Sequence, residues 1–269
     1  MIDIWPGDLV CLRYDDQPEN QAVVGQTARV TTQPSPDSPY WMDVLFEGQA
    51  YSVRGGDCTR VSQVVAGIDE VGRGALAGNL VVVAAAFRLP GAWEVHPCPI
   101  PDVKDSKAYK ATSKLTVEER REAAAQAILH WPSLRGAGAG VVTPEEINAH
   151  GMSWAMQEAI QRAVAGIQVD GKRLRPDLIL LDGHERVPNW SGAQRATPKA
   201  DALWWPVSAA SVLAKVYRDR EMIAMDKVYP GYGFGRHKGY GTEQHIKALQ
   251  TKGPTPIHRT TFIRSALGE

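Results

Sequence analysis

The chain has 269 residues, of which 43% are hydrophobic and 22% are charged, and its formal net charge is zero. This balance is typical of a globular, soluble protein. No apolar run approaches the roughly 18 residues of a membrane span, and the start lacks the basic and apolar regions of a secretory signal. We therefore expect a cytoplasmic protein with no membrane partner.

Residues 1–62 are predicted to form a small separate domain. Short strand candidates at 8–12, 26–30, 41–46 and 50–53 suit a small, strongly bent β-barrel, which weakly resembles KOW or Tudor modules. Nine acids and four bases give this part a net charge of −5, which is poorly suited to binding phosphates. We expect it to dock a protein partner or to pack against the second domain. Cys11 and Cys58 could lie close together there, and both are expected to be reduced.

Residues 63–269 show a different pattern, in which apolar strand candidates alternate with amphipathic helices. The strands are predicted at 64–69, 80–87, 138–142 and 178–182, and the helices at 116–130, 144–167 and 208–228. Thr143 followed by Pro144 is a strong signal for a helix start. Such alternation predicts an α/β domain, with a sheet covered by helices on both faces.

The first strand candidate of this domain ends in chemistry-bearing residues. Asp69 and Glu70 follow an apolar run and precede the turn Gly72-Arg73-Gly74. Buried carboxylates are costly unless a cation compensates them, and a glycine turn with a guanidinium suits a phosphodiester. Acids that can hold a metal beside donors that can hold phosphate indicate phosphodiester chemistry.

Later segments add to this pattern. The strand candidate at 178–182 ends in Asp182, and the helix candidate at 208–228 carries Asp219. From residue 230 to residue 264 there are six bases and one acid, so this tail is the best candidate for following a phosphate backbone. The four acids are far apart in sequence, so only the fold could bring them together.

At these segments the chain resembles the bacterial ribonuclease HII (type 2 ribonuclease H) family. The resemblance is carried, in order along residues 64–267, by GIDEVGRGALAG, VKDSK, LDG, SAASVLAKVYRDR, GYGFGRHKGYGT and GPTPIHRTTF. Several ordered motifs are much more specific than one short pattern. The N-terminal module is not a general feature of that family.

The resemblance implies a ribonuclease H-like fold, with a mixed five-stranded sheet and a C-terminal helical subdomain. It implies an endoribonuclease, expected to be a monomer, that hydrolyses RNA in RNA–DNA hybrids and incises on the 5′ side of single ribonucleotides embedded in duplex DNA. The products would carry 3′-hydroxyl and 5′-phosphate ends. The implied biological role is the removal of misincorporated ribonucleotides and RNA primers.

The resemblance also implies a role for each motif acid. Asp69, Glu70, Asp182 and Asp219 would be the catalytic residues and would hold two Mg²⁺ or Mn²⁺ ions, with Asp69 as the central ligand. Clustered carboxylates raise one another's pKa, and bound cations would relieve that repulsion. One ion would activate the attacking water, and the other would stabilise the leaving 3′-oxygen.

For the substrate, the resemblance implies that Gly72, Arg73 and Gly74 contact the 2′-hydroxyl and adjoining phosphates of one ribonucleotide. Tyr240 would pack on the next sugar, and Lys107 would hold a backbone phosphate. The 2′-hydroxyl is the group by which proteins distinguish RNA from DNA.

The chain departs from the family pattern in several places, which bear on substrate fit and rate. Ala75 and Asn79 stand where family members usually have proline, and Tyr217 replaces a smaller residue. Trp204 and Trp205 are bulkier than usual. Three histidines, at positions 237, 245 and 258, match no catalytic role and are expected to be structural or phosphate-facing.

Other functions are disfavoured by particular features. A dinucleotide-binding loop needs its glycine turn directly after the strand and before a helix, whereas here two acids intervene and another strand follows. A paired-carboxylate glycosidase would not explain the basic tail or the glycine turn. A binding protein that has lost catalysis would lack one of the four acids. Arg73 and Tyr240 favour the HII family over its sister family HIII.

Overall fold

The structure is a computed structural model that describes residues 9–12, 20, 27–30, 41–47, 49–54, 58–60, 62–90, 98, 100, 103, 106 and 108–267. The chain forms two compact units: Met1–Val64 with Arg88–Glu94, and Val65–Phe87 with Val95–Glu269. The division at residue 62 that the sequence suggests lies close to the first limit. That the two parts are independent domains stays a prediction.

The N-terminal unit contains a five-stranded antiparallel sheet. Its strands are β1 (Leu9–Leu12), β2 (Thr27–Val30), β3 (Trp41–Phe46), β4 (Gln49–Arg54) and β5 (Cys58–Arg60), in the order β4-β3-β2-β1-β5. Met42 and Val44 are buried and alternate with more exposed neighbours, as expected when one face of a sheet covers a core. The likeness to KOW or Tudor barrels stays a prediction.

The second unit is built on a mixed five-stranded sheet in the order β12-β11-β6-β7-β8, which confirms the predicted fold class. The strands are β6 (Ser62–Val71), β7 (Leu80–Pro90), β8 (Leu134–Val142), β11 (Leu178–Asp182) and β12 (Ala193–Thr197). The neighbours β6, β11 and β12 run parallel, whereas β7 and β8 are antiparallel. A small hairpin, β9 (Gln168–Val169) with β10 (Lys172–Arg173), lies outside this sheet.

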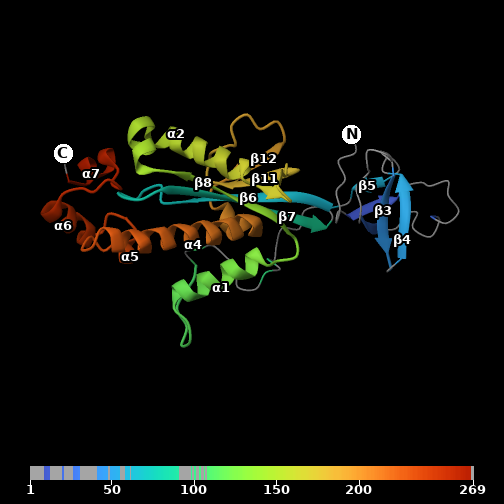
Figure 1. Cartoon of the computed structure of the whole chain (residues 1–269), viewed down its shortest axis with the longest axis horizontal. Helices are drawn as coiled ribbons and strands as arrows, with labels where there is room; N and C mark the ends of the chain where they lie inside the picture. The colour runs from blue at the N-terminus through green and yellow to red at the C-terminus, as the bar shows by residue number, and fades with distance from the viewer. Residues whose placement is uncertain are drawn as a thin grey trace. The chain divides into compact units, whose positions relative to one another are not determined.

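Helices cover both faces of this sheet (Figure 1). The helix α2 (Pro144–Ala165), which is kinked at Gly151, lies on one face, and α1 (Val117–Leu129) and α4 (Trp205–Val228) lie on the other. The predicted helix start at Thr143 is confirmed, because its hydroxyl accepts a hydrogen bond from the Glu146 N–H in a capping box. A Cβ at Gly67 would overlap the backbone of Pro206, so this glycine lets α4 approach β6 closely.

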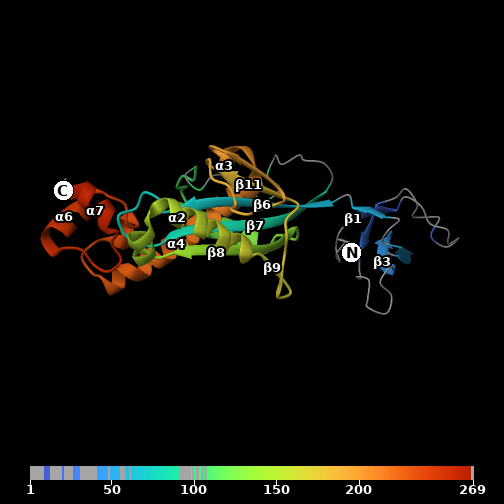
Figure 2. The same cartoon turned by 90° about the horizontal axis from the view of Figure 1, so that it is seen from above.

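The C-terminal part is the helical subdomain that the sequence predicted. The short helices α3 (Ala200–Leu203) and α5 (Phe234–His237) lie on either side of α4 along the chain, and α6 (Glu243–Lys252) and α7 (Thr260–Leu267) follow. Figure 2 shows α6 and α7 at the end of the sheet where the chain passes from β6 to β7. The subdomain therefore lies beside the Gly72–Gly74 turn, which is part of that connection.

Candidate active site

Two neighbouring parallel strands bring three of the predicted acids together. Asp69 and Glu70 lie near the end of β6, and Asp182 is the last residue of β11. Leu181 pairs with Ile68, so the next residues along the two strands are Asp182 and Asp69. One ligand atom from each of the three carboxylates lies within 4.8 Å of the others.

Burial and repulsion act together on Asp69, which is only 7% exposed. Burial raises the pKa of its carboxyl group well above the ordinary value; a hydrogen bond with Ser211 opposes this shift, and the charges of Glu70 and Asp182 add to it. Asp69 also accepts a hydrogen bond of 2.8 Å from the Glu70 N–H, and Asp182 accepts one of 2.8 Å from the Ala200 N–H. The group thus concentrates negative charge in a buried place, where a cation would be favourable.

The three acids fit a hard divalent cation. They offer only oxygen atoms, which are the donors that Mg²⁺ and Mn²⁺ prefer. Together with Glu185 they line a recess of about 10 Å³, which is roughly the space of one water molecule. The apolar wall of the recess includes Met156 and Ile160.

Asp219, the fourth predicted acid, is not part of this group of three. It lies on α4, where one of its carboxylate oxygens is 2.6 Å from the Lys215 ammonium group. Both side chains are largely buried, at 12% and 17% exposure. Lys215 therefore compensates the charge of Asp219 from one helical turn away, whereas no such ion pair within the described residues accompanies Asp69.

Two buried arginines support the Gly72–Gly74 turn and the segment that follows it. Arg259 donates to the carbonyl oxygens of Gly72 at 2.7 Å, Arg73 at 3.1 Å and Gly78 at 2.8 Å. Arg218 donates to the carbonyl oxygens of Ala77, Asn79 and Lys238 at 2.7–2.9 Å. Both guanidinium groups are fully buried, so the shape of the turn depends on them.

The outer side of the same turn is open. Arg73 and Gly74 are exposed, and a Cβ at Gly74 would have no neighbour within 4 Å. The Arg73 guanidinium lies 3.7 Å from the Glu185 carboxylate, with 52% of the Arg73 side chain exposed. Such a long, exposed ion pair contributes little to stability, so the guanidinium is available to another anion.

Tyr240 lies beside the turn, with its ring centroid 5.6 Å from the Arg218 guanidinium carbon. It is 37% exposed. Lys107, the predicted phosphate contact, lies outside the described residues. Its neighbour Ser106 is buried and bonds through its hydroxyl to Ser211, which in turn bonds to Asp69.

The basic tail is only in part a surface feature. Lys238 and Arg259 are buried and donate to backbone carbonyl oxygens, so they hold loops together inside the subdomain. The exposed bases of the segment are Arg236, Lys247, Lys252 and Arg264. Only these four remain available to a phosphate backbone.

The departures from the family motifs have local explanations. Asn79, where proline is usual, donates a hydrogen bond of 3.2 Å to the Glu221 carboxylate of α4. Ala75 is fully buried in the turn. Tyr217 is 42% exposed and lines a cavity between α1, α4 and β8, away from the acids. Trp205 is buried against Phe87, with ring centroids 4.6 Å apart.

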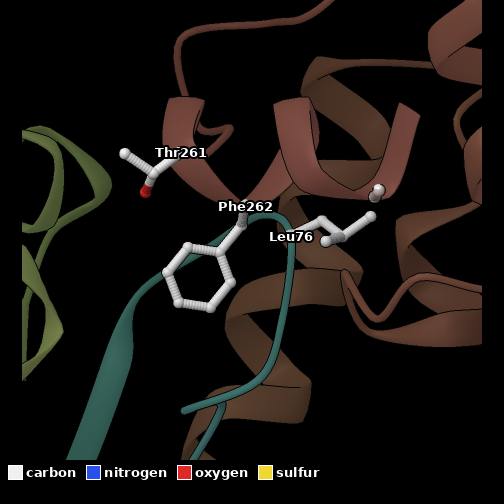
Figure 3. Close-up of a pocket in the computed structure, with 4 residues that line it drawn as sticks. Leu76, Thr261 and Phe262 are labelled. Atoms are coloured by element: carbon white, nitrogen blue, oxygen red, sulfur yellow. The ribbon is translucent and has the colours of Figure 1, made fainter. Parts of the chain in front are cut away.

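A shallow hollow of about 440 Å³ adjoins the turn on its C-terminal side. Figure 3 shows three residues that line this hollow: Leu76, which follows the turn, and Thr261 and Phe262 of α7. Leu76 is held from both sides, because its N–H donates to the Gly239 carbonyl and its own carbonyl accepts from the Arg259 N–H. The turn, the Tyr240 loop and α7 therefore form one packed surface.

Several residues of this site were missed by sequence reasoning. Glu185, Ser211 and Lys215 contact or face the predicted acids, and Arg218 and Arg259 hold the turn. Arg218 adjoins Asp219 within a motif, and that position is the only signal in the sequence that could have pointed to it. Charge alone predicts an exposed arginine rather than a fully buried one.

A mixed sheet with carboxylates at neighbouring parallel strand ends, beside a glycine-arginine-glycine turn, fits a metal-dependent phosphodiester hydrolase. Comparison with solved structures agrees: the chain is similar to the crystal structure of ribonuclease H2 from Pyrococcus horikoshii OT3. The TM-score is 0.57 and the identity 29%, with 76% of this chain and 96% of that one covered. The class is thus a ribonuclease H-type hydrolase.

Sequence comparison identifies the family. Residues 66–265 match the family model of ribonuclease HII. The chain is 41% identical over 235 residues to ribonuclease HII of Syntrophobacter fumaroxidans, covering 85% of this chain and 87% of that protein. It is 40% identical over 201 residues to ribonuclease HII of Herpetosiphon aurantiacus, covering 75% and 89%. The chain belongs to the ribonuclease HII family.

Family membership confirms the predicted reaction in outline. The protein is an endoribonuclease that acts on RNA in RNA–DNA hybrids, and its activity depends on divalent metal ions. In the described part of the chain, no helix is long and apolar enough to cross a membrane.

Proposed function

We propose that this enzyme incises duplex DNA on the 5′ side of a single embedded ribonucleotide, as well as cleaving RNA–DNA hybrids, and leaves 3′-hydroxyl and 5′-phosphate ends. In a cell, this activity would remove misincorporated ribonucleotides and RNA primers. The observation that carries the proposal is the position of the open Gly72–Gly74 turn directly after Asp69 and Glu70 on the same strand. A ribose held at the turn would present its adjoining phosphate to the acids.

Asp69, Glu70, Asp182 and Asp219 would hold two Mg²⁺ or Mn²⁺ ions. When bound, the ions supply an activated water and stabilise the leaving 3′-oxygen. Asp69 would be the central ligand, because it is the most buried of the three acids that gather at the strand ends. Asp219 would complete the ligand set from α4, where its charge is compensated by the ion pair with Lys215.

The turn and Tyr240 would recognise the substrate. Arg259 holds the carbonyl groups of Gly72 and Arg73, and Arg218 holds that of Ala77 in the segment that follows, so the shape of the turn is set before the substrate arrives. Gly74 leaves room for a ribose, and Gly72 has a φ of 87°, which glycine adopts readily. The exposed Arg73 would contact a phosphate. Tyr240 would pack on the following sugar, and Lys107 would hold a backbone phosphate.

The test is cleavage of a duplex DNA with one embedded ribonucleotide, in the presence of Mg²⁺ or Mn²⁺. We expect the wild type to incise on the 5′ side of the ribonucleotide, and the labelled upstream fragment to be extended by a DNA polymerase because it ends in a 3′-hydroxyl. Asp69→Asn should abolish incision. The matched control is Asp170→Asn in an exposed turn, where φ is 50° and asparagine is well tolerated.

Folded wild-type protein that binds the duplex without cleaving it would contradict the proposal. Cleavage of an RNA–DNA hybrid without incision at the single ribonucleotide would restrict the enzyme to hybrids. Equal activity of Asp69→Asn and wild type would show that the acid cluster is not the site.

We propose in addition that the N-terminal sheet docks a protein partner. Residues 1–62 carry a net charge of −5, and the remaining residues carry +5. An acidic module repels the phosphate backbone that the second unit must approach. A contribution to nucleic-acid affinity is therefore not expected from it.

A further inference from the structure

Three histidines of the C-terminal subdomain form a buried cluster around Phe234. His245 is fully buried, His258 is 2% exposed and His237 is 9% exposed. The rings of His237 and His245 are stacked with centroids 4.5 Å apart, and those of His245 and His258 are 5.2 Å apart. None of these side chains lines the recess of the acids, and the reaction described above makes no use of them.

The hydrogen bonds of His245 and His258 determine where their protons lie. His245 Nδ1 lies 3.0 Å from the Tyr240 carbonyl oxygen, which can only accept, so this nitrogen carries a proton. His258 Nδ1 accepts from the Thr255 N–H at 2.8 Å, and the Thr255 hydroxyl lies at the same distance. The Thr255 carbonyl is farther from that nitrogen, at 3.3 Å, so His258 Nδ1 is the acceptor.

The two proton positions together determine the direction of the hydrogen bond between the rings. His245 Nε2 and His258 Nε2 are 3.0 Å apart, so one must donate and the other accept. His258 has its proton on Nε2, and His245 has Nε2 free of a proton, so His258 donates to His245. The result is a single directed chain from the Thr255 N–H through both neutral rings to the Tyr240 carbonyl. An additional proton on either ring would place two N–H donors opposite each other, either between the two rings or between His258 Nδ1 and the Thr255 N–H, and would break the chain.

Each end of this chain leads to a group at the proposed substrate surface. At one end is Tyr240, whose carbonyl accepts from His245 and whose ring lies over Arg218. At the other end is His258, which pairs with Ala77 in an isolated β-bridge. The next residue, Arg259, holds the carbonyl groups of Gly72 and Arg73.

We propose that His245 and His258 form a neutral hydrogen-bond relay that positions Tyr240 relative to the Gly72–Gly74 turn, and so determines how strictly the enzyme requires a ribonucleotide followed by a deoxyribonucleotide. The inference rests on the proposed function, in which the turn contacts the ribose and Tyr240 the next sugar. His245 and His258 are positioning residues, because they reach the substrate only through Tyr240 and Arg259.

The surroundings keep the relay neutral. Burial lowers the pKa of His245 to about 4, with further lowering by His237 and His258. Burial likewise lowers the pKa values of His258 and His237. The charged groups that act on the cluster are Asp226 and Lys238, which both act on His237 and have opposite signs. At neutral pH all three rings are therefore uncharged.

The first test reads the protons directly. In the full-length protein at pH 7, nitrogen-15 NMR of the imidazole rings should find His245 protonated on Nδ1 alone and His258 on Nε2 alone. A charged ring, or His245 protonated on Nε2 instead, would overturn the relay. This measurement needs no substrate, so it decides the relay independently of the proposed function.

The second test measures substrate discrimination as the ratio of kcat/KM for a single embedded ribonucleotide to kcat/KM for an RNA–DNA hybrid. His258→Phe keeps a ring but removes the donor to His245, and should lower the ratio about tenfold, the effect of one hydrogen bond. His258→Gln keeps a donor at the Nε2 position and should recover most of the ratio. The matched control is Tyr232→Phe, which loses a partly buried hydrogen bond from the Tyr232 hydroxyl to the Gly253 carbonyl; the Tyr232 ring stacks on Phe234 of the same cluster.

An unchanged ratio in His258→Phe, or an equal fall in Tyr232→Phe, would overturn the positioning role. A wild type that does not incise at single ribonucleotides would overturn the proposed function and, with it, the role of the relay in recognition. The imidazole protonation states would still establish whether the relay itself exists.

Discussion

Replacement of Arg259 by methionine should loosen the turn on which substrate recognition depends. Arg259 is fully buried, and it donates to the carbonyl oxygens of Gly72, Arg73 and Gly78. Burial lowers the pKa of this arginine to about 9, so the guanidinium is still ionised at neutral pH. It is surrounded by carbonyl dipoles, and no carboxylate within the described residues pairs with it.

The magnitude follows from the acceptors that the variant would leave behind. The Gly72 carbonyl keeps a long hydrogen bond of 3.3 Å from the Ala75 N–H, and Arg73 is exposed, so water can reach it. Gly78 is buried, and its carbonyl would lose both of its bonds to Arg259. The variant leaves one buried acceptor unsatisfied and loses charge-assisted hydrogen bonds, but it also removes a buried charge. The net loss in the free energy of unfolding is about 3 kcal/mol.

The assay is urea unfolding of Arg259→Met followed by circular dichroism, with the midpoint compared at constant slope. Arg264→Met is the matched control, because Arg264 lies on α7, which begins directly after Arg259, but is exposed, and it should change stability by less than about 0.5 kcal/mol. Under conditions where both variants are folded, Arg259→Met should also lose roughly a hundredfold in kcat/KM, because misplacement of a binding group is costly. A loss of stability below about 1 kcal/mol, or full activity, would refute the role assigned to Arg259.

Three further outcomes are expected. Folding lowers the pKa of His245 from 6.5 to about 4, so the stability that its neutral form contributes is complete above about pH 6.5 and is lost as the pH falls toward 4. Urea unfolding over this pH range should therefore show the free energy of unfolding fall by roughly 3 kcal/mol. A free energy of unfolding that does not change with pH would contradict this. Lys215→Met removes the cation beside Asp219 and should strengthen Mn²⁺ binding in calorimetry about fivefold, whereas Lys227→Met on the exposed face of the same helix should not. Deletion of residues 1–62 should leave the affinity for an RNA–DNA hybrid within about threefold, and a large loss would rule out a docking role.

The predicted elements of the second unit agree with the structure because their signals are local. The strand candidate at 64–69 became β6, and the cap at Thr143 was recognised from neighbouring residues alone. The fifth strand, β12, was missed, since its polar sequence lacks the apolar pattern that marks the other strands. It is an edge strand, so it needs little apolar surface.

The candidate site was predictable to the extent that its residues lie in contiguous motifs. Asp69 and Glu70 with the adjoining turn, and Asp182 at a strand end, could be identified from residue types and order. Pairing of Leu181 with Ile68 then brings Asp182 beside Asp69, and that register depends on how distant strands associate. The sequence could not show how close Asp219 on α4 lies to the other three acids, because that distance depends on how α4 packs against the sheet.

The sequence by itself determined the class of chemistry, because carboxylates after buried strands and a glycine-arginine-glycine turn restrict what the residues can do. The tertiary structure alone decided which polar side chains are buried and hydrogen-bond to distant backbone groups and rings. Arg218, Arg259, His245 and His258 have side chains that are usually exposed, and their burial depends on carbonyl groups and rings supplied by segments far away in the chain. The sequence of either segment alone does not reveal such a hydrogen bond, because the bond forms only when folding brings both partners together and removes them from water.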